Sequence, residues 1–164
     1  MNVPSVNKRS INRRCFLFAL LLPQVVGVAS AAVRGREVMY VGGSIADLPE
    51  KIEGRLDLES EDKASFQSKK GTFSFGYKNI TSLEYGQKAG RRVGVAVAVS
   101  PLFLLSKKRR HYLTVGYTDG DGNAQGVVFE VGKKHVRDIL STLESRSGKS
   151  VEYESEEARE HVGN

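Results

Sequence analysis

Short stretches of alternating apolar and polar residues, separated by turn residues, run through most of the chain. In GRLDLES, Leu56 and Leu58 alternate with charged side chains, and this period of two places both leucines on one face of a strand. Similar stretches occur at residues 37–45, 64–68, 72–77, 79–86, 111–119 and 124–131. The pattern predicts a mostly β fold of six to seven antiparallel strands.

Turn residues between these stretches indicate which strands pair as hairpins. Lys69-Lys70-Gly71 separates ASFQS from TFSFGY, and a Gly- and Asp-rich turn separates residues 111–119 from 124–131. Short turns of this composition join antiparallel neighbours. The Gly42-Gly43 pair inside the first stretch indicates a bulge or a bend.

The hydrophobic period changes once, near the C-terminus. Four apolar residues recur there at the spacing i, i+3, i+4 and i+7, which forms one stripe of an amphipathic helix. They are Val136, Ile139, Leu140 and Leu143, and Gly148 is placed to end the helix. The acidic residues 149–164 follow as a tail, which we expect to be a surface strand or helix, or frayed.

The segment FSFGYKNITSLEYGQ (residues 73–87) combines an aromatic strand end, a Tyr77-x-x-Ile80 step and a following strand. In these features it resembles the middle of bacterial pleckstrin-homology-like and GRAM-like domains, and the helix from Val136 to Leu143 matches their last element. The resemblance covers residues 37–146 and depends on hydrophobic patterns. It implies a PH-like barrel of six to seven antiparallel strands, closed at one end by a single C-terminal amphipathic helix.

Domains of this kind bind lipids, peptides or other proteins and are generally not enzymes, so the resemblance implies a binding module. Members that bind phosphoinositides carry a basic cluster in the first hairpin, which this chain lacks. Phosphoinositide binding is therefore not expected. The run from Val93 to Leu105 is an insertion relative to a minimal domain of this kind.

Residues 1–31 have the organisation of an export signal peptide. Four cations precede an apolar stretch from Cys15 to Val28, and Ala29-Ser30-Ala31 offers the small residues that a signal peptidase accepts. We expect cleavage after Ala31 or Ala32 and a periplasmic or extracellular mature protein; an uncleaved membrane anchor is the alternative. The one cysteine leaves with the signal, so no disulfide is expected.

The basic charge of the chain is concentrated in one segment. The whole sequence has a net charge of +6, but without residues 1–31 it has 21 Lys and Arg against 19 Asp and Glu. Seven of these cations and no acid lie between Lys88 and Arg110, so the rest of the mature chain is net acidic. A local basic patch favours a directed surface contact, and export argues against nucleic acid as the partner.

An uncharged run of thirteen residues, from Val93 to Leu105, lies inside this basic segment. As a helix it is about 20 Å long, too short to cross a hydrocarbon layer of about 30 Å. The run is either a buried strand followed by a turn, or an element that dips into a bilayer interface and returns. Cations on both sides favour the second interpretation, because each is worth about 1 kcal/mol near an anionic surface. The predicted membrane-contacting residues are Arg91, Arg92, Leu102, Phe103, Leu104, Leu105, Lys107, Lys108, Arg109 and Arg110.

No pattern in the sequence indicates catalysis or metal binding. His111, His135 and His161 lack the spacing of metal ligands. TDGDGNAQGVVFE places Asp119 at the first position of a calcium loop, but the sixth position is Ala124 where the turn requires glycine, so a polar hairpin turn is expected. We therefore expect no cofactor, no bound metal and no enzymatic activity.

Together these patterns predict a non-catalytic exported binding or scaffold module that associates with the membrane surface through a basic-flanked apolar loop. Its partner is then an anionic membrane surface. The alternative is a soluble periplasmic module that binds a protein partner through a strand edge or through the surface of residues 93–105.

Overall fold

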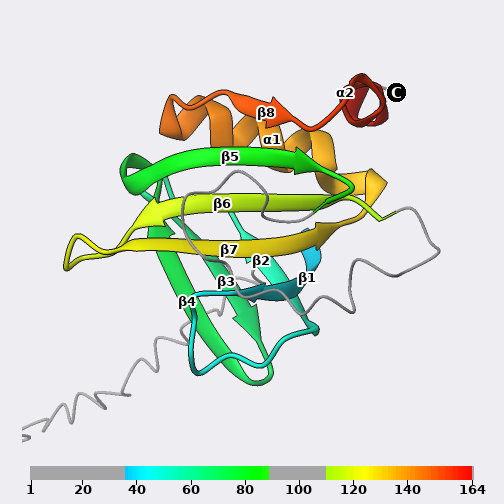
Figure 1. Cartoon of the computed structure of the whole chain (residues 1–164). Coiled ribbons are helices and arrows are strands. Elements are labelled where there is room, and N and C mark those ends of the chain that lie inside the picture. The colour runs from blue at the N-terminus through cyan, green and yellow to red at the C-terminus, as the bar shows by residue number, and fades with distance from the viewer. Residues whose placement is uncertain (1–35, 89–109, 164) are drawn as a thin grey trace, which may run out of the picture. The chain divides into compact units, whose positions relative to one another are not determined.

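A computed structural model describes residues 36–88 and 110–163 (Figure 1). All of them belong to one compact unit, Ala32–Asn164. In chain order the elements within the described residues are β1 (Arg36–Gly43), β2 (Ile52–Asp57), β3 (Lys63–Ser68), β4 (Gly71–Gly76), the short 3-10 helix η1 (Tyr77–Asn79), β5 (Ile80–Gly86), β6 (Tyr112–Thr118), β7 (Ala124–Val131), α1 (Lys133–Ser147), β8 (Val151–Tyr153) and α2 (Glu156–Gly163).

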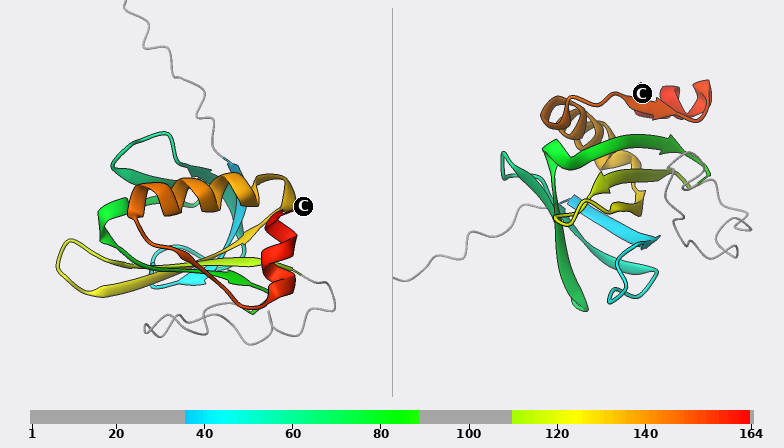
Figure 2. Two further views of the ribbon diagram at one scale, coloured as in Figure 1. Left: turned by 90° about the horizontal axis from the view of Figure 1, so that it is seen from above. Right: turned by 60° about the vertical axis from the view of Figure 1, so that its left-hand side comes forward.

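The eight strands of the described residues form one sheet in the order β4-β3-β2-β1-β7-β6-β5-β8. Strands β1 to β4 are antiparallel neighbours, and β5 to β7 form a second antiparallel set. The pairing of β1 with β7 joins the two sets. Figures 1 and 2 show that β2 to β4 run at a steep angle to β5 to β7. Because β1 bridges them, one continuous sheet surrounds the core on two sides.

The mostly β fold with a C-terminal helix is confirmed, and the number of strands differs from the prediction. Seven strands precede α1, and the tail adds β8, which pairs in parallel with β5. A surface strand or helix was expected in this tail, but three residues are too short to show an alternating pattern, so the bounds and the partner of β8 were not predicted. The sheet is also not closed, because the outermost described strands β4 and β8 each have one neighbour.

Both predicted hairpins are confirmed. Across the β3–β4 turn, Ser68 is paired with Gly71, and the Ser68 hydroxyl accepts hydrogen bonds from the N–H groups of Lys70 and Gly71 at 3.2 Å. Strands β6 and β7 pair along their length. The bulge near the Gly42-Gly43 pair is present as a register shift between Tyr40 and Gly42. The predicted turn chemistry thus fixes these strand pairings.

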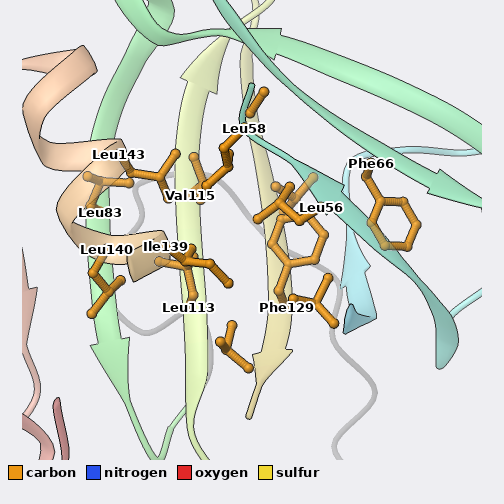
Figure 3. Packing of buried hydrophobic residues seen from close by; sticks show 14 of the residues in the cluster. Leu56, Leu58, Phe66, Leu83, Leu113, Val115, Phe129, Ile139, Leu140 and Leu143 are labelled. Carbon is orange, nitrogen blue, oxygen red and sulfur yellow. The ribbon is translucent and has the colours of Figure 1, made fainter. Parts of the chain in front are cut away.

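The core lies between the sheet and α1. Figure 3 shows Ile139, Leu140 and Leu143 pointing from α1 toward the side chains of β5 and β6. The four residues of the predicted apolar stripe are all at most 1% exposed. Burial of each such side chain is worth about 1.5–3 kcal/mol. Gly148 ends the helix in the left-handed conformation, with φ of 68°.

Aromatic side chains fill the part of the core that lies between β7 and the antiparallel set of β1 to β4. The ring of Phe66 lies 5.5 Å from Phe129 and 6.0 Å from Tyr40, measured between centroids. Phe73 of the edge strand stacks on Phe129 at 6.2 Å. These contacts tie the two antiparallel sets together away from α1.

Candidate functional site

The segment predicted to contact a membrane lies largely outside the described residues. Arg110 is described, together with Lys88 and the preceding end of β5. The described part of the site therefore consists of the two chain ends that flank residues 89–109. Outside the described residues lie Arg91, Arg92, Leu102, Phe103, Leu104, Leu105, Lys107, Lys108 and Arg109.

The two flanking ends lie together at one end of the sheet. β5 ends at Gly86 and β6 begins at Tyr112, and these residues are paired partners. The carbonyl of His111 also accepts a hydrogen bond from the Val131 N–H at 3.2 Å, which extends the contact with β7. Figure 1 shows β5 ending beside the start of β6. Residues 89–109 therefore leave and rejoin the sheet at adjacent positions.

Glu154, in the link between β8 and α2, fixes the first of these ends. Its Oε2 accepts hydrogen bonds from the N–H groups of Gln87 at 2.6 Å and Lys88 at 2.9 Å, and its Oε1 lies 3.3 Å from Lys88 Nζ. Burial acts to raise the pKa of Glu154, but the hydrogen bonds from Lys88 and Gln87 and the Lys88 charge outweigh it and lower the pKa. The carboxylate is therefore ionised at neutral pH and holds two consecutive backbone donors.

Arg110 at the second end is paired with Glu130 of β7. Its Nη1 donates to Glu130 Oε2 at 2.6 Å, and the two side chains are 31% and 24% exposed. The hydrogen bond to Glu130 and the charge of that carboxylate raise the pKa of Arg110. A guanidinium has five N–H donors, so it can hold one carboxylate and a second anion together. The pair fixes where the Arg110 charge lies at this end of the sheet.

A small apolar cluster lies beside Arg110 on the face of the sheet opposite to α1. Val41 and Val128 are fully buried, Tyr112 is 4% exposed, and Met39 packs against them. We call these four residues the outer cluster. Their neighbours along the strands, such as Val38 and Phe129, belong to the main core, as the alternation of a strand requires. The sheet is therefore apolar on both faces at the end that holds the site.

A shallow hollow of about 670 Å³ lies next to the outer cluster. Its charged lining consists of the carboxylates of Glu37, Glu53 and Glu130 with the cations of Arg55 and Lys69. Three acids against two bases do not favour an anionic ligand. The hollow is therefore not a candidate site for anionic headgroups.

The structure brings together two histidines that the sequence separates by 50 positions. His111 follows Arg110, and its ring lies 3.8 Å from that of His161 on α2, with an angle of 18° between the planes. Sequence reasoning considered His161 only as a metal ligand. It missed the contact of His161 with His111 and missed Glu154 altogether, because the tail has no pattern that predicts where it docks. The pairing of β8 with β5 brings Glu154 and His161 to this end of the sheet, and that pairing is not visible in the sequence.

The turn between β6 and β7 is the predicted polar hairpin. The Asp119 carboxylate accepts hydrogen bonds from Gln125 Nε2 at 2.8 Å and from the N–H groups of Asn123 at 2.8 Å and Asp121 at 3.0 Å. These donors, with Gln125 contributing most, lower the pKa of Asp119. The carboxylate is thus used to close the turn.

Two further observations concern the described ranges 36–88 and 110–163. No group of three or more His, Cys, Asp or Glu side chains there is arranged to hold a metal ion. None of the helices in these ranges has the length and apolar composition that a membrane crossing requires.

No family model matches the chain, and no curated protein is similar to it.

Proposed function

We propose that the chain is a non-catalytic binding or scaffold module that associates with an anionic membrane surface through residues 91–110. The observation that supports this most directly is the adjacency of the two flanking ends. Gly86 is paired with Tyr112, so both basic flanks start from one end of the sheet. A segment held in this way can present all its cations to one plane.

The energetics of this arrangement favour binding to a charged surface. The pairing of β5 with β6 already holds the two ends together, so docking needs little additional loop-closure entropy. Each cation near an anionic surface contributes about 1 kcal/mol. Partial insertion of residues 102–105 adds to this, at up to about 1.5–3 kcal/mol for each fully buried side chain.

We further propose that the domain is of the PH-like type. Support comes from the order of elements: a four-stranded antiparallel set, a three-stranded set and then α1 across the core. In the resembling families this arrangement serves binding and not catalysis. β8 and α2 are then additions to the C-terminal end of such a domain.

We also propose that the protein is exported and that residues 1–31 are removed. Under this proposal the mature N-terminus is residue 32 or 33. N-terminal sequencing of the protein recovered from the periplasm or medium of a bacterial host tests it. Recovery in the membrane fraction with residues 1–31 intact would instead support the uncleaved anchor.

Vesicle sedimentation tests the membrane proposal. Wild-type protein should sediment with vesicles rich in phosphatidylglycerol but not with phosphatidylcholine vesicles, and added salt should weaken binding because it screens exposed charges. Leu102→Ser, Phe103→Ser and Leu104→Ser combined should abolish binding. Lys107→Gln, Lys108→Gln and Arg109→Gln combined should do the same.

A matched charge control comes from β3 and the β3–β4 turn, which lie outside residues 91–110. Lys63→Gln, Lys69→Gln and Lys70→Gln remove three cations from the β3–β4 hairpin and should leave sedimentation unchanged. Equal loss in this variant would show that total charge, and not residues 91–110, determines binding. Identical partitioning of the wild type with both vesicle types at low salt would reject the membrane proposal.

The alternative is a soluble periplasmic module that binds a protein partner. One observation favours it: β4 is an edge strand, because β3 is its one neighbour in the described sheet. An extended peptide can add to such an edge through backbone hydrogen bonds. The surface of residues 93–105 is the second candidate contact. Failure of every vesicle measurement with a folded wild-type protein would favour this function.

A further inference from the structure

The C-terminal segment Val151–Gly163, which comprises β8 and α2, is attached to β5 and to α1 by a small set of contacts. On α1, Arg137 donates hydrogen bonds to the carbonyls of Val162 and Gly163. β8 contributes three residues, paired in parallel with β5 from Leu83 to Tyr85. The Val151 N–H donates to Glu144 Oε1 at 2.6 Å, and Ala158 of α2 is fully buried. A short edge strand with few buried side chains can detach at a lower free energy than global unfolding.

Its contact with His111, the residue that precedes β6, is a stack of two imidazoles. The rings of His111 and His161 lie 3.8 Å apart, and the Tyr85 ring lies 5.6 Å from His111 and 6.4 Å from His161. His111 is 9% exposed, and within the described residues its Nε2 has no hydrogen-bond partner. A neutral imidazole tolerates this environment, whereas an imidazolium loses hydration there without gaining an acceptor.

Charged groups from several elements surround the stack. Glu154 and Glu157 favour a proton on His111, whereas burial and the neighbouring His161 oppose it more strongly and lower the pKa of His111. Burial lowers the pKa of His161, and Lys133 of α1 lowers it further. Both rings are therefore neutral in the docked state at neutral pH.

We propose that Val151–Gly163 is a latch that stays docked on β5 and α1 while His111 and His161 are neutral and is released when they are protonated. Two imidazolium rings in stacking contact repel each other, and separation of α2 from the sheet removes the repulsion. Released histidines titrate near 6.5. Because both groups bind protons less readily when docked, docking is strongest above this pH and weakens as the pH falls below it.

The Glu154 carboxylate beside the stack acts in a different pH range. Glu154 has a lowered pKa, so its contribution persists until the pH falls below its ordinary value of 4.5. Release between pH 7.5 and 5.0 therefore reports the histidines. The inference does not depend on membrane binding, since every contact in it lies within the described domain.

Hydrogen exchange of the full chain, followed by mass spectrometry, tests the latch. Protection factors, corrected for the intrinsic pH dependence of exchange, are compared between pH 7.5 and 5.0. Peptides that contain Val151 and Glu154 should lose protection about tenfold or more, while β2 and β3 peptides should keep theirs. Equal protection of the tail at both pH values, or a parallel loss in β2 and β3, would overturn the proposal.

Two variants separate the histidine pair from general acid effects. His161→Phe keeps an aromatic ring on α2 but cannot be protonated, so its tail should lose less protection than the wild-type tail over the same range, and the loss that remains comes from the buried His111. His135→Phe removes the third histidine, which lies on α1 outside the stack, and should behave as the wild type does. An acid-induced loss in His161→Phe equal to that of the wild type would also overturn the latch.

Discussion

Gly86 is the residue at which β5, the tail and the flank of residues 89–109 meet. A Cβ atom there would overlap the Cβ and carboxylate of Glu154. Glycine therefore allows the carboxylate to reach the N–H groups of Gln87 and Lys88. The absence of a side chain at Gly86 thus allows Glu154 of the tail to bind the end of β5.

Gly86→Ala should destabilise the fold because the new methyl group displaces Glu154 from these donors. We expect a loss of about 1–3 kcal/mol in the free energy of unfolding, the usual cost of overpacking. Denaturant unfolding measures it. Gly120→Ala is the matched control, because no heavy atom lies within 4 Å of its Cβ position. Equal effects of the two substitutions would contradict the role of close packing at Gly86.

Glu154→Gln should show the contribution of the carboxylate through its pH dependence. At pH 7 the variant should be about 1–3 kcal/mol less stable than the wild type, because the Gln87 and Lys88 donors lose a charged acceptor. Since the folded state lowers the pKa of Glu154, this difference should disappear as the pH falls below 4.5. Thermal unfolding between pH 3 and 7 checks it, with Glu160→Gln on α2 as a control that should show no such trend.

At the scale of elements, α1 is the main cover of the core. Ile139, Leu140 and Leu143 are at most 1% exposed and pack against the side chains of β5 and β6 (Figure 3). The helix ends where Gly148 adopts a positive φ and its N–H donates to the Glu144 carbonyl at 2.9 Å. Glu144 also binds β8 through its side chain, so the end of α1 positions the start of the tail.

Leu140→Ala should cost about 2–5 kcal/mol of stability, because it leaves a cavity between α1 and the sheet that the core cannot fill. Ser141→Ala, on the exposed side of the same helix, should change stability by less than about 0.5 kcal/mol. Urea unfolding followed by circular dichroism compares them. If Leu140→Ala lost no more stability than Ser141→Ala, the packing of α1 on the sheet would not be what buries the core.

Elements with a clear period were predictable from the sequence, and those without one were not. Leu56 and Leu58 alternate with charged residues, and Val136 to Leu143 keep a helical spacing, so both faces could be assigned. Ile80 and Leu83 are three apart and both buried, because the register shifts between Ile80 and Ser82. The tail was expected to be a surface strand or helix, or frayed, and it forms both β8 and α2. The pairing of β8 depends on β5 and on Glu144, and local patterns do not show these partners.

The residue types of the candidate site were predictable from the sequence, but the contacts that hold its two flanking ends to the domain were not. The basic flanks and the apolar run are visible in the sequence as a local charge pattern. The contacts that hold the flanking ends are long-range, since Glu154 reaches Lys88 and Glu130 reaches Arg110. Pairs of this kind require the register of the sheet and the path of the tail, neither of which is set locally.

At the scale of the whole molecule, the central claim is that residues 91–110 meet an anionic bilayer from one end of the sheet. The proposal has Leu102 to Leu105 contact the acyl boundary of the bilayer, and the alternative is that these side chains pack against the domain itself. Such packing would keep these side chains within the domain. Binding to a bilayer requires that they reach lipid, so their environment decides between the two.

A single tryptophan at position 103 tests this claim most directly, because the chain contains no tryptophan of its own. With vesicles rich in phosphatidylglycerol, the emission of Phe103→Trp should shift to the blue and be quenched by brominated acyl chains. Thr72→Trp, on the exposed side of β4, should show neither change. Emission from Phe103→Trp that is already blue-shifted without vesicles and unaffected by brominated lipid would contradict the account.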